Sequence, residues 1–201
     1  PTATVLQPWS IEEERAGYRG IKRIASTLSG TGACRGEKVT RNHAVQLVRN
    51  HHFYRDYAAE INVWNESTVL IEASQGFDLS INWGHTYPYV TSRDITPHAI
   101  LNSAGVPFDH NLIGDIIGVI RPLPIRVGNL PEGTSGPCYS DQQELSWDLV
   151  TAACGAPTLL QEYTTVTIRK RRIFTFSKEQ IRKFTYYCKP TELFLNFTQY
   201  I

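Results

Sequence analysis

The sequence contains no methionine, even at its first position, and it has no long apolar run. A chain that lacks an initiator methionine has been processed or is part of something longer, and we expect these 201 residues to be such a part. The longest apolar runs, such as residues 116–120, are far shorter than the ~20 residues of a membrane-spanning helix. An N-terminal signal with a charged and then an apolar part is also missing. These absences predict a soluble protein.

Closely spaced cysteines are missing as well. The four cysteines are scattered along the chain: Cys34, Cys138, Cys154 and Cys188. This spacing argues against a zinc knuckle, a redox pair or a small disulfide framework, so we expect reduced thiols and a cytoplasmic protein. His51 and His52 are adjacent, and neighbouring side chains on a helix diverge, which makes them a poor pair of metal ligands.

Neither sign of charge is in excess. Twenty basic and nineteen acidic residues give a net charge of +1, so no whole-chain field attracts nucleic acid or an anionic membrane. Hydrophobic residues, by contrast, are abundant and make up 41% of the chain. At this length, that fraction is enough to bury the core of a single domain or of a large domain fragment.

Capping residues and apolar spacing predict alternating helices and strands. Ser10 with Glu13, Ser146 with a Gly155 stop, and Ser177 with Gln180 are helix-terminus signals. Together with the spacing they predict helices over residues 10–24, 38–50, 109–114, 147–154 and 178–189, and strands over 67–73, 116–121 (buried) and 191–197, with a loop and strand over 164–176. The pattern favours an α/β fold with a mainly parallel central sheet, flanking helices and long ligand-binding loops.

The segment SQGFDLSINWGHTYPYVTS, residues 74–92, contains glycines and a Tyr-Pro-Tyr that no helix or central strand would carry. Gln75 beside Gly76 suggests a buried amide offered to a ligand, because glycine lets another group approach the backbone. The alternative is a plain connector between two elements.

A second loop, STLSGTGACRGEK, combines hydroxyl side chains with three glycines ahead of the helix expected at 38–50. Free amides before a helix can cradle a phosphate, and Lys38 and Arg41 can add positive charge. The Gly-Lys-Ser/Thr ending of a Walker loop is missing, so the motif alone is weak.

Four consecutive cations at residues 169–172 follow Thr164, Thr165 and Thr167. They fit a solvated edge strand whose charges prevent association with other sheets. They also fit a dicarboxylate site in which Arg169 and Arg171 each grip a carboxylate while hydroxyls fix the remaining oxygens. Nucleic-acid binding is a third interpretation, weakened by the neutral charge balance.

Several of these segments, in their order along the chain, resemble the adenylosuccinate synthetases. The matching pieces are STLSGTGACRGEKVTR, SQGFDLSINWGHTYPYVTS, IRPLPIRVG, TTVTIRKRR and TELFLNF, and the resemblance covers nearly all of the chain. TSRD and SGPCYSDQQELSW resemble most the compact archaeal and phage branch, which includes phage enzymes that make 2-aminoadenylosuccinate from deoxyguanylate.

The resemblance implies a ligase of purine biosynthesis. In this family a nucleoside triphosphate phosphorylates the 6-oxygen of a purine monophosphate, and the amine of aspartate displaces that phosphate. It implies that Thr27 binds the substrate phosphate, that Arg41 reaches the same phosphate in the neighbouring subunit of a homodimer, that Gln75 is the catalytic residue at the reacting purine, and that Thr91 is a second nucleotide contact.

Two further contacts follow from the resemblance. Arg126 and Val127 match a segment that closes over the ribose. The family's Lys-x-Leu-Asp-like reader of the donor guanine appears here as Asn196, Phe197 and Thr198. An aspartate accepts both N1–H and N2–H₂ of guanine and a threonine cannot, so we expect ATP or dATP rather than GTP as the donor.

For aspartate, the resemblance implies that Arg169 and Arg171 bind the two carboxylates, with Thr165 and Thr167 beside them. Neutralising both carboxylates leaves the amine as the free reactive group, so binding also orients the nucleophile.

The sequence departs from the family at three places. The N-terminal phosphate loop with its catalytic aspartate and histidine has no counterpart, so we expect the Mg²⁺ ligands to lie in a missing N-terminal part and none in this chain. The C-terminal segment that encloses the donor base is also without a counterpart. His85 is a small insertion with no assigned role.

The favoured hypothesis is therefore a phage-type enzyme that acts on dGMP, aspartate and ATP or dATP in the host cytoplasm. The alternatives are an ordinary adenylosuccinate synthetase that uses IMP and GTP, and a catalytically inactive fragment that binds a purine nucleotide. None of the three implies a nucleic acid or a membrane as partner.

Overall fold

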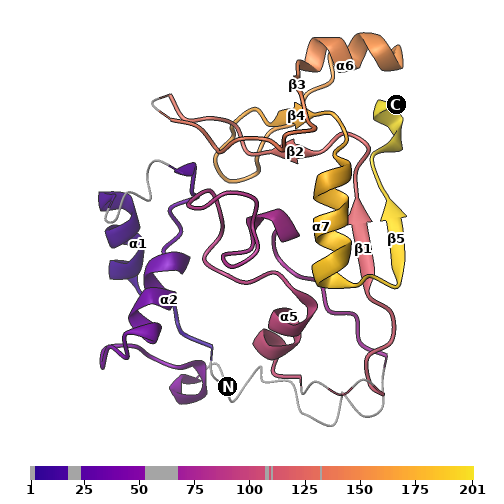
Figure 1. The fold of residues 1–201 in the computed structure, drawn as a ribbon. Coiled ribbons are helices and arrows are strands. Elements are labelled where there is room, and N and C mark those ends of the chain that lie inside the picture. The colour runs from indigo at the N-terminus through magenta and orange to yellow at the C-terminus, as the bar shows by residue number, and fades with distance from the viewer. Residues whose placement is uncertain (1–2, 18–23, 53–67, 107–108, 110, 132) are drawn as a thin grey trace.

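The computed structural model describes residues 3–17, 24–52, 68–106, 109, 111–131 and 133–201. In chain order its elements are α1 (Pro8–Ala16), α2 (Thr31–Val39), η2 (Val48–Asn50), η3 (Phe77–Leu79), α5 (Pro97–Ala104), β1 (Ile117–Ile120), β2 (Ile125–Arg126), β3 (Glu144–Leu145), α6 (Trp147–Cys154), β4 (Arg172–Phe174), α7 (Lys178–Cys188), β5 (Glu192–Leu195) and η4 (Thr198–Tyr200). Figure 1 shows α1 and α2 on one side, and α7 beside β1 and β5 on the other. The predicted α/β class is confirmed.

The strands form two small sheets in the described part of the chain. β1 and β5 pair in parallel, from Ile117 opposite Glu192 to Ile120 opposite Leu195. β4 lies between β2 and β3 and is antiparallel to both. Arg172, the last cation of the 169–172 run, therefore belongs to a central strand, and the edge-strand interpretation is wrong at this residue.

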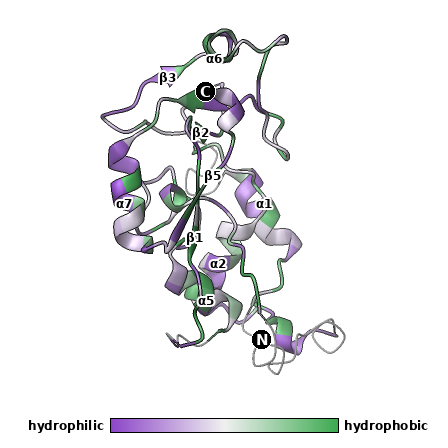
Figure 2. Cartoon of the chain, turned by 90° about the vertical axis from the view of Figure 1, so that its right-hand side faces the viewer, coloured by the Kyte–Doolittle hydropathy of each residue, from purple (hydrophilic) through white to green (hydrophobic). Residues whose placement is uncertain are grey.

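Helix α7 packs against the parallel strands β1 and β5, which are seen edge-on in Figure 2. Gly118 in β1 makes this approach possible, because a Cβ atom there would lie 2.8 Å from the Phe184 ring of α7. Phe184 in turn contacts Phe77 of η3, with ring centroids 5.9 Å apart. The strand over 117–120 was correctly predicted but is not buried, since Ile117 and Val119 are exposed.

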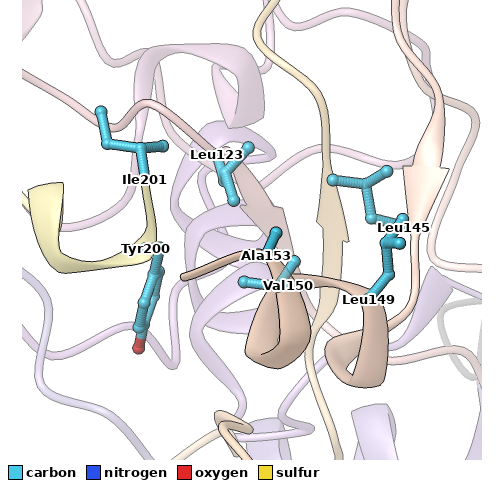
Figure 3. Close-up of a pocket in the computed structure, with 7 residues that line it drawn as sticks. All are labelled: Leu123, Leu145, Leu149, Val150, Ala153, Tyr200 and Ile201. Carbon is cyan, nitrogen blue, oxygen red and sulfur yellow. The ribbon is translucent and has the colours of Figure 1, made fainter. Parts of the chain in front are cut away.

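The three-stranded sheet packs on α6. Trp147, Val150 and Ile173 are buried together, and Trp147 Nε1 donates a hydrogen bond of 2.7 Å to the Arg171 carbonyl. Beside this core is an apolar cavity of about 250 Å³, whose lining is drawn in Figure 3. Tyr200 of η4 borders it, with its hydroxyl on the side away from Leu123 (Figure 3).

Helices with local capping signals were predicted correctly. Ser146 accepts a hydrogen bond from the Leu149 amide at the start of α6, and Gly155 ends that helix in the left-handed region at φ 67°. Ser177 likewise caps α7 through the Gln180 amide. The strand predicted over 191–197 is present as β5.

The predicted helix over 10–24 is wrong in both bounds. α1 begins at Pro8 and ends at Ala16, because Gly17 turns left-handed at φ 82°. Ser10 lies within the helix rather than capping it, and its buried hydroxyl donates a hydrogen bond to Glu37. Residues 18–23 lie outside the described residues.

The predicted helix over 38–50 is also wrong. Helix α2 occupies the preceding glycine-containing segment, which was expected to be a loop, and stops at Val39. Arg41 is left-handed at φ 57°, and the Asn42 side chain accepts a hydrogen bond from the Ala44 amide. Such local side-chain bonds compete with helix formation, so between Val39 and Asn50 only η2 is helical.

Two short predictions fail as well. Residues 68–73 form no strand, and Leu70 is exposed, while Ser67 lies outside the described residues. Residues 111–114 form a turn and an irregular stretch, not the helix predicted over 109–114, and the Asp109 carboxylate accepts from the Asn111 amide. Residue 110 lies outside the described residues. A strand needs a hydrogen-bonded partner, which a single apolar run does not guarantee.

None of the described helices is long and apolar enough to span a bilayer.

Candidate functional site

A cleft of about 1470 Å³ lies between the helices α1 and α2, the 74–92 loop and the segment before β4. Eight of the twelve predicted site residues line it: Thr27, Gln75, Thr91, Arg126, Val127, Thr165, Thr167 and Arg171. Segments that are far apart in the sequence therefore contribute to one cavity. Arg41, Arg169, Asn196 and Thr198 are not among its lining residues.

Hydroxyl groups gather where the chain enters α2. Thr27 Oγ1 lies 3.1 Å from Ser29 Oγ, which lies 3.3 Å from Thr31 Oγ1. All three side chains line the cleft. A row of exposed hydroxyls can donate to the oxygens of an anion such as a phosphate.

The amides at the start of α2 are already occupied, which corrects the expectation that they are open to a phosphate. Glu14 is buried, and its carboxylate accepts from the amides of Gly30 (2.7 Å), Gly32 (2.7 Å) and Ala33 (3.2 Å). The negative charge complements the positive end of the helix dipole. No sequence pattern indicated this contact, because Glu14 and Gly30 are 16 residues apart.

The 74–92 loop is irregular, as predicted, and is held by a buried serine. Ser80 Oγ donates to Asp94 (2.8 Å) and accepts from the Ile95 amide (3.1 Å). Gly84 is required for this packing, because a Cβ atom would lie 2.6 Å from the Ser80 carbonyl oxygen. The Thr91 amide donates to the Leu79 carbonyl, which closes the loop at its cleft side.

Gln75 stands at the entrance to this loop in a left-handed conformation, φ 73°, which is unusual for a residue other than glycine. Its side chain is exposed to the cleft rather than buried, so the expected burial of its amide is wrong. No described residue forms a hydrogen bond with this amide. The backbone conformation instead presents the amide to the cavity.

Asp78 organises the floor of the cleft. Its carboxylate accepts from the Tyr139 hydroxyl (2.6 Å) and from the side-chain amide Nε2 of Gln180 in α7. Burial and this hydrogen bond raise the pKa of Tyr139 well above its ordinary value, so the phenol stays protonated and donating. Burial and then the neighbouring Arg172 lower the pKa of Arg126, while Asp78 opposes this shift. Arg126 Nη2 donates to the Ser135 carbonyl at 2.9 Å.

His85, the inserted residue, has a packing role. Its ring stacks on Tyr139 with centroids 3.8 Å apart, and Nε2 lies 3.0 Å from the Cys138 carbonyl oxygen. The insertion thus ties the loop to the segment that presents Tyr139.

The threonine segment turns tightly before the cations. Thr164 Oγ1 and Thr167 Oγ1 are 2.6 Å apart, and Ile168 is left-handed at φ 48°. Arg171 then lines the cleft, and its Nε donates to the Tyr163 carbonyl at 3.4 Å. Its Nη atoms have no hydrogen-bond partner among the described residues, which leaves them available to a ligand. Arg169 Nη1 is buried and likewise has no partner in the described part of the chain.

Arg172 behaves differently from Arg171. It forms a bidentate ion pair with Glu144, at 2.9 and 2.6 Å, and donates to the Gly136 carbonyl at 2.6 Å. These contacts join β4 to β3 and to the chain before it. The Arg172 side chain therefore has a structural role in the sheet.

The remaining predicted residues lie at the periphery. Arg41 is exposed just after α2. Asn196 follows β5, and its side-chain oxygen accepts from the Phe197 amide, while Thr198 opens η4.

Sequence reasoning missed a second ion pair at the cleft. Arg121 donates to Glu162 at 2.5 and 3.3 Å, and its guanidinium carbon lies 3.6 Å from the centre of the Phe197 ring. Arg121 Nε is buried without a partner among the described residues. A local signal for this pair was lacking, because its members are 41 residues apart.

The cleft is thus lined by four arginines, Arg93, Arg121, Arg126 and Arg171. Such a lining suits an anionic ligand that exposes several oxygens. In the described ranges, His, Cys, Asp and Glu side chains form no group of three or more that could hold a metal ion.

Comparison with known proteins gives a consistent set of relatives. A family model described as adenylosuccinate synthetase matches residues 51–199. The N6-succino-2-amino-2'-deoxyadenylate synthase of Vibrio phage phiVC8 is 35% identical, over 100% of this chain and 57% of the relative. The adenylosuccinate synthetase of Archaeoglobus fulgidus is 34% identical, over 84% of this chain and 46% of the relative.

A solved structure is similar over almost the whole chain. It is the cyanophage S-2L succinoaminodeoxyadenylate synthetase (PurZ), bound to dGMP and to dATP as an energy donor. The TM-score is 0.82 at 35% identity, and the match covers 99% of this chain and 57% of the other. The chain therefore spans about half the length of these proteins.

Proposed function

Because the chain belongs to the adenylosuccinate synthetase family, we propose that the protein is a ligase that joins aspartate to the 6 position of a purine monophosphate, with hydrolysis of a nucleoside triphosphate. The observation that carries the proposal is that Gln75, Thr165 and Arg171 line one cleft. A purine at Gln75 and a diacid at Arg171 would share this cavity, as a reaction between them requires.

The favoured purine is dGMP, giving 2-amino-2'-deoxyadenylosuccinate, the intermediate toward diaminopurine. Phage relatives at 34–37% identity, whose names specify this product, support the choice. Archaeal adenylosuccinate synthetases at 31–34% identity support a second candidate, the ordinary reaction with IMP. The phage relatives are matched over a larger share of this chain, which favours dGMP.

On the nucleotide side, Thr27 and its hydroxyl neighbours would bind the substrate phosphate. Arg41 would reach the same phosphate across a homodimer interface, which its exposed position after α2 permits. Gln75 would hydrogen-bond the purine near its 6-oxygen, and Thr91 would make a further nucleotide contact. Arg126, with Val127, would cover the ribose.

On the aspartate side, the two Nη atoms of Arg171 have no partner among the described residues, so they are suited to a bidentate grip on one carboxylate. Arg169 would bind the other carboxylate once its buried Nη1 turns to the ligand, with Thr165 and Thr167 supplying hydroxyls. This neutralisation leaves the amine to displace the phosphate from the 6 position.

The donor triphosphate would be ATP or dATP, with Asn196 and Thr198 at its base. Neither side chain is an anionic acceptor of the guanine Watson–Crick edge, and the cyanophage structure has dATP as its donor. The family's Mg²⁺ finds no fitting ligand group among the described residues.

The test is turnover by the protein as encoded, with aspartate, Mg²⁺ and either dGMP with dATP or IMP with GTP. We expect a succinylated product from dGMP. Turnover of IMP alone would establish the ordinary reaction instead, and calorimetric binding of dGMP without any product would indicate a nucleotide-binding protein.

A matched pair of variants separates chemistry from folding. Gln75→Ala should abolish turnover without lowering the melting temperature, because its side chain is exposed and bonded to no described residue. Gln161→Ala is the control, since Gln161 is an exposed glutamine that does not line the cleft. Equal activity of the two variants would contradict the role given to Gln75.

A further inference from the structure

The Glu162 carboxylate joins three separate parts of the chain. Oε1 accepts from Arg121 Nη2 at 2.5 Å and from the Tyr200 hydroxyl at 3.0 Å. Oε2 accepts from Arg121 Nη1 at 3.3 Å and lies 3.9 Å from Arg171 Nε. The segment after β1, the residues before β4 and η4 therefore meet at one carboxylate.

The C-terminal side of this junction is the segment 196–200. Phe197 lies under the Arg121 guanidinium, with 3.6 Å from the ring centre to its central carbon. Tyr200 borders the apolar cavity (Figure 3), and its hydroxyl donates to the Glu162 carboxylate. Any ligand that restrains residues 196–200 therefore also restrains Arg121 and Glu162.

The other side of the junction is Arg171. Its amide donates to the Glu162 carbonyl at 2.7 Å, and its Nε faces the Glu162 carboxylate and the Tyr163 carbonyl. With the Nε edge held in this way, the Nη edge is left for the cleft, which Arg171 lines. Two cations share one anion here, so positive charge remains for an anionic ligand.

The environment keeps Glu162 ionised. Burial raises its pKa, but hydrogen bonds and charge from Arg121, then Tyr200 and Arg171, lower it below the ordinary value. The carboxylate and Arg121 side chains are only 19% and 14% exposed, so solvent screens this network less than a surface pair.

We propose that Glu162 is a positioning residue that couples the donor-nucleotide segment 196–200 to the aspartate-binding Arg171. The inference rests on the proposed function, which assigns Asn196 and Thr198 to the donor base and Arg171 to the diacid. A base bound at 196–198 fixes Phe197 and Tyr200, and through Arg121 and Glu162 it orders Arg171. The second ligand then loses less side-chain entropy on binding, and the coupling is reciprocal.

The coupling is measured by titrating L-aspartate calorimetrically into the protein as encoded, with and without saturating dATP. Purine monophosphate is left out so that no turnover occurs. We expect dATP to tighten aspartate binding about five- to tenfold, and aspartate to tighten dATP binding by the same factor. Glu162→Gln should reduce this factor to about one, since the neutral amide no longer holds both guanidinium groups.

Glu144→Gln is the matched control. It removes a comparable bidentate ion pair, with Arg172, from residues that do not line the cleft. Its coupling factor should equal that of the wild type. Tyr200→Phe removes a single hydroxyl and should reduce the coupling partially, which keeps a test available if Glu162→Gln does not fold.

The outcomes separate this inference from the proposed function. A wild-type protein that binds neither aspartate nor dATP contradicts the proposed function itself. Binding of both ligands without coupling, or full coupling retained in Glu162→Gln or in Tyr200→Phe, overturns the inference alone. The same holds if Glu144→Gln loses as much coupling as Glu162→Gln.

Discussion

Two adjacent arginines, Arg171 and Arg172, should respond to alanine substitution in opposite ways. Arg172 makes two hydrogen bonds to Glu144, one to Ser135 Oγ and one to the Gly136 carbonyl, and its side chain is 13% exposed. Among the described residues, the Arg171 side chain makes only a 3.4 Å hydrogen bond to the Tyr163 carbonyl and a 3.9 Å approach to Glu162. Arg172→Ala should therefore lower the stability of the fold, and Arg171→Ala should weaken ligand binding.

The magnitudes follow from these contacts. Removing Arg172 costs about 2–3 kcal/mol of unfolding free energy, after allowance for the exposed Glu144, because charged hydrogen bonds are lost and buried acceptors remain. In a domain of about this size that lowers the melting temperature by roughly 4–12 °C. Removing Arg171 costs less than about 1 kcal/mol of stability, but it deletes a bidentate grip on a carboxylate worth about 2–3 kcal/mol.

The assay measures the apparent KM for aspartate and the melting temperature of both variants. Arg171→Ala should raise the KM about 30- to 160-fold, the equivalent of 2–3 kcal/mol, with a melting temperature close to the wild type. Arg172→Ala should melt earlier and keep its aspartate KM at a temperature where it is folded. An unchanged KM in Arg171→Ala would refute the assignment of Arg171 to the diacid, as would a raised KM in folded Arg172→Ala.

Three further changes test the scaffold and the assembly. Glu14→Gln should lower the free energy of unfolding by about 1–3 kcal/mol, measured by denaturant titration, since the amides at the start of α2 lose a charged acceptor; an unchanged value would contradict its role. The Ser177 hydroxyl and two α7 amides lower the pKa of Asp141 below its ordinary value, so its stabilisation is present above the unfolded pKa and is lost as pH falls through the folded one. Melting curves should therefore drop on acidification less steeply for Asp141→Asn than for the wild type, and parallel curves would exclude this. Mixing Arg41→Ala with Arg171→Ala should restore about a quarter of wild-type activity if Arg41 acts across a dimer interface, whereas a mixture as inactive as its components would place Arg41 in its own subunit's site.

The helices that could be predicted from the sequence are those whose ends are decided locally. Ser146, Gly155 and Ser177 act within three or four residues of themselves, so α6 and α7 were located correctly. α2 begins instead where Glu14 meets the amides of residues 30–33, a contact that spacing does not reveal. A strand over 68–73 failed for a related reason, since strand formation depends on a partner elsewhere in the chain.

The candidate site likewise has residues that the sequence could indicate and residues whose contacts depend on distant parts of the chain. Residue types left the cations at 169–172 open to three interpretations, and the family resemblance selected the diacid site. The structure brings eight of the predicted residues to one cleft, but their chemical roles remain predictions. Arg121 and Glu162 were missed because neither has a motif of its own; they form a unit only when β1 and the segment before β4 come together.

The four cations show why charge density alone could not indicate a function. Arg172 is neutralised within the sheet, Lys170 is exposed, Arg169 has a buried Nη1 without a partner in the described chain, and Arg171 lines the cleft. A nucleic acid needs several cations on one accessible surface, and this arrangement distributes them among different environments. A small diacid needs only two guanidinium groups with unoccupied donors. Among the described residues, the Nη atoms of Arg171 at the cleft and the buried Nη1 of Arg169 have no hydrogen-bond partner. The local environments, rather than the number of charges, therefore favour the smaller ligand.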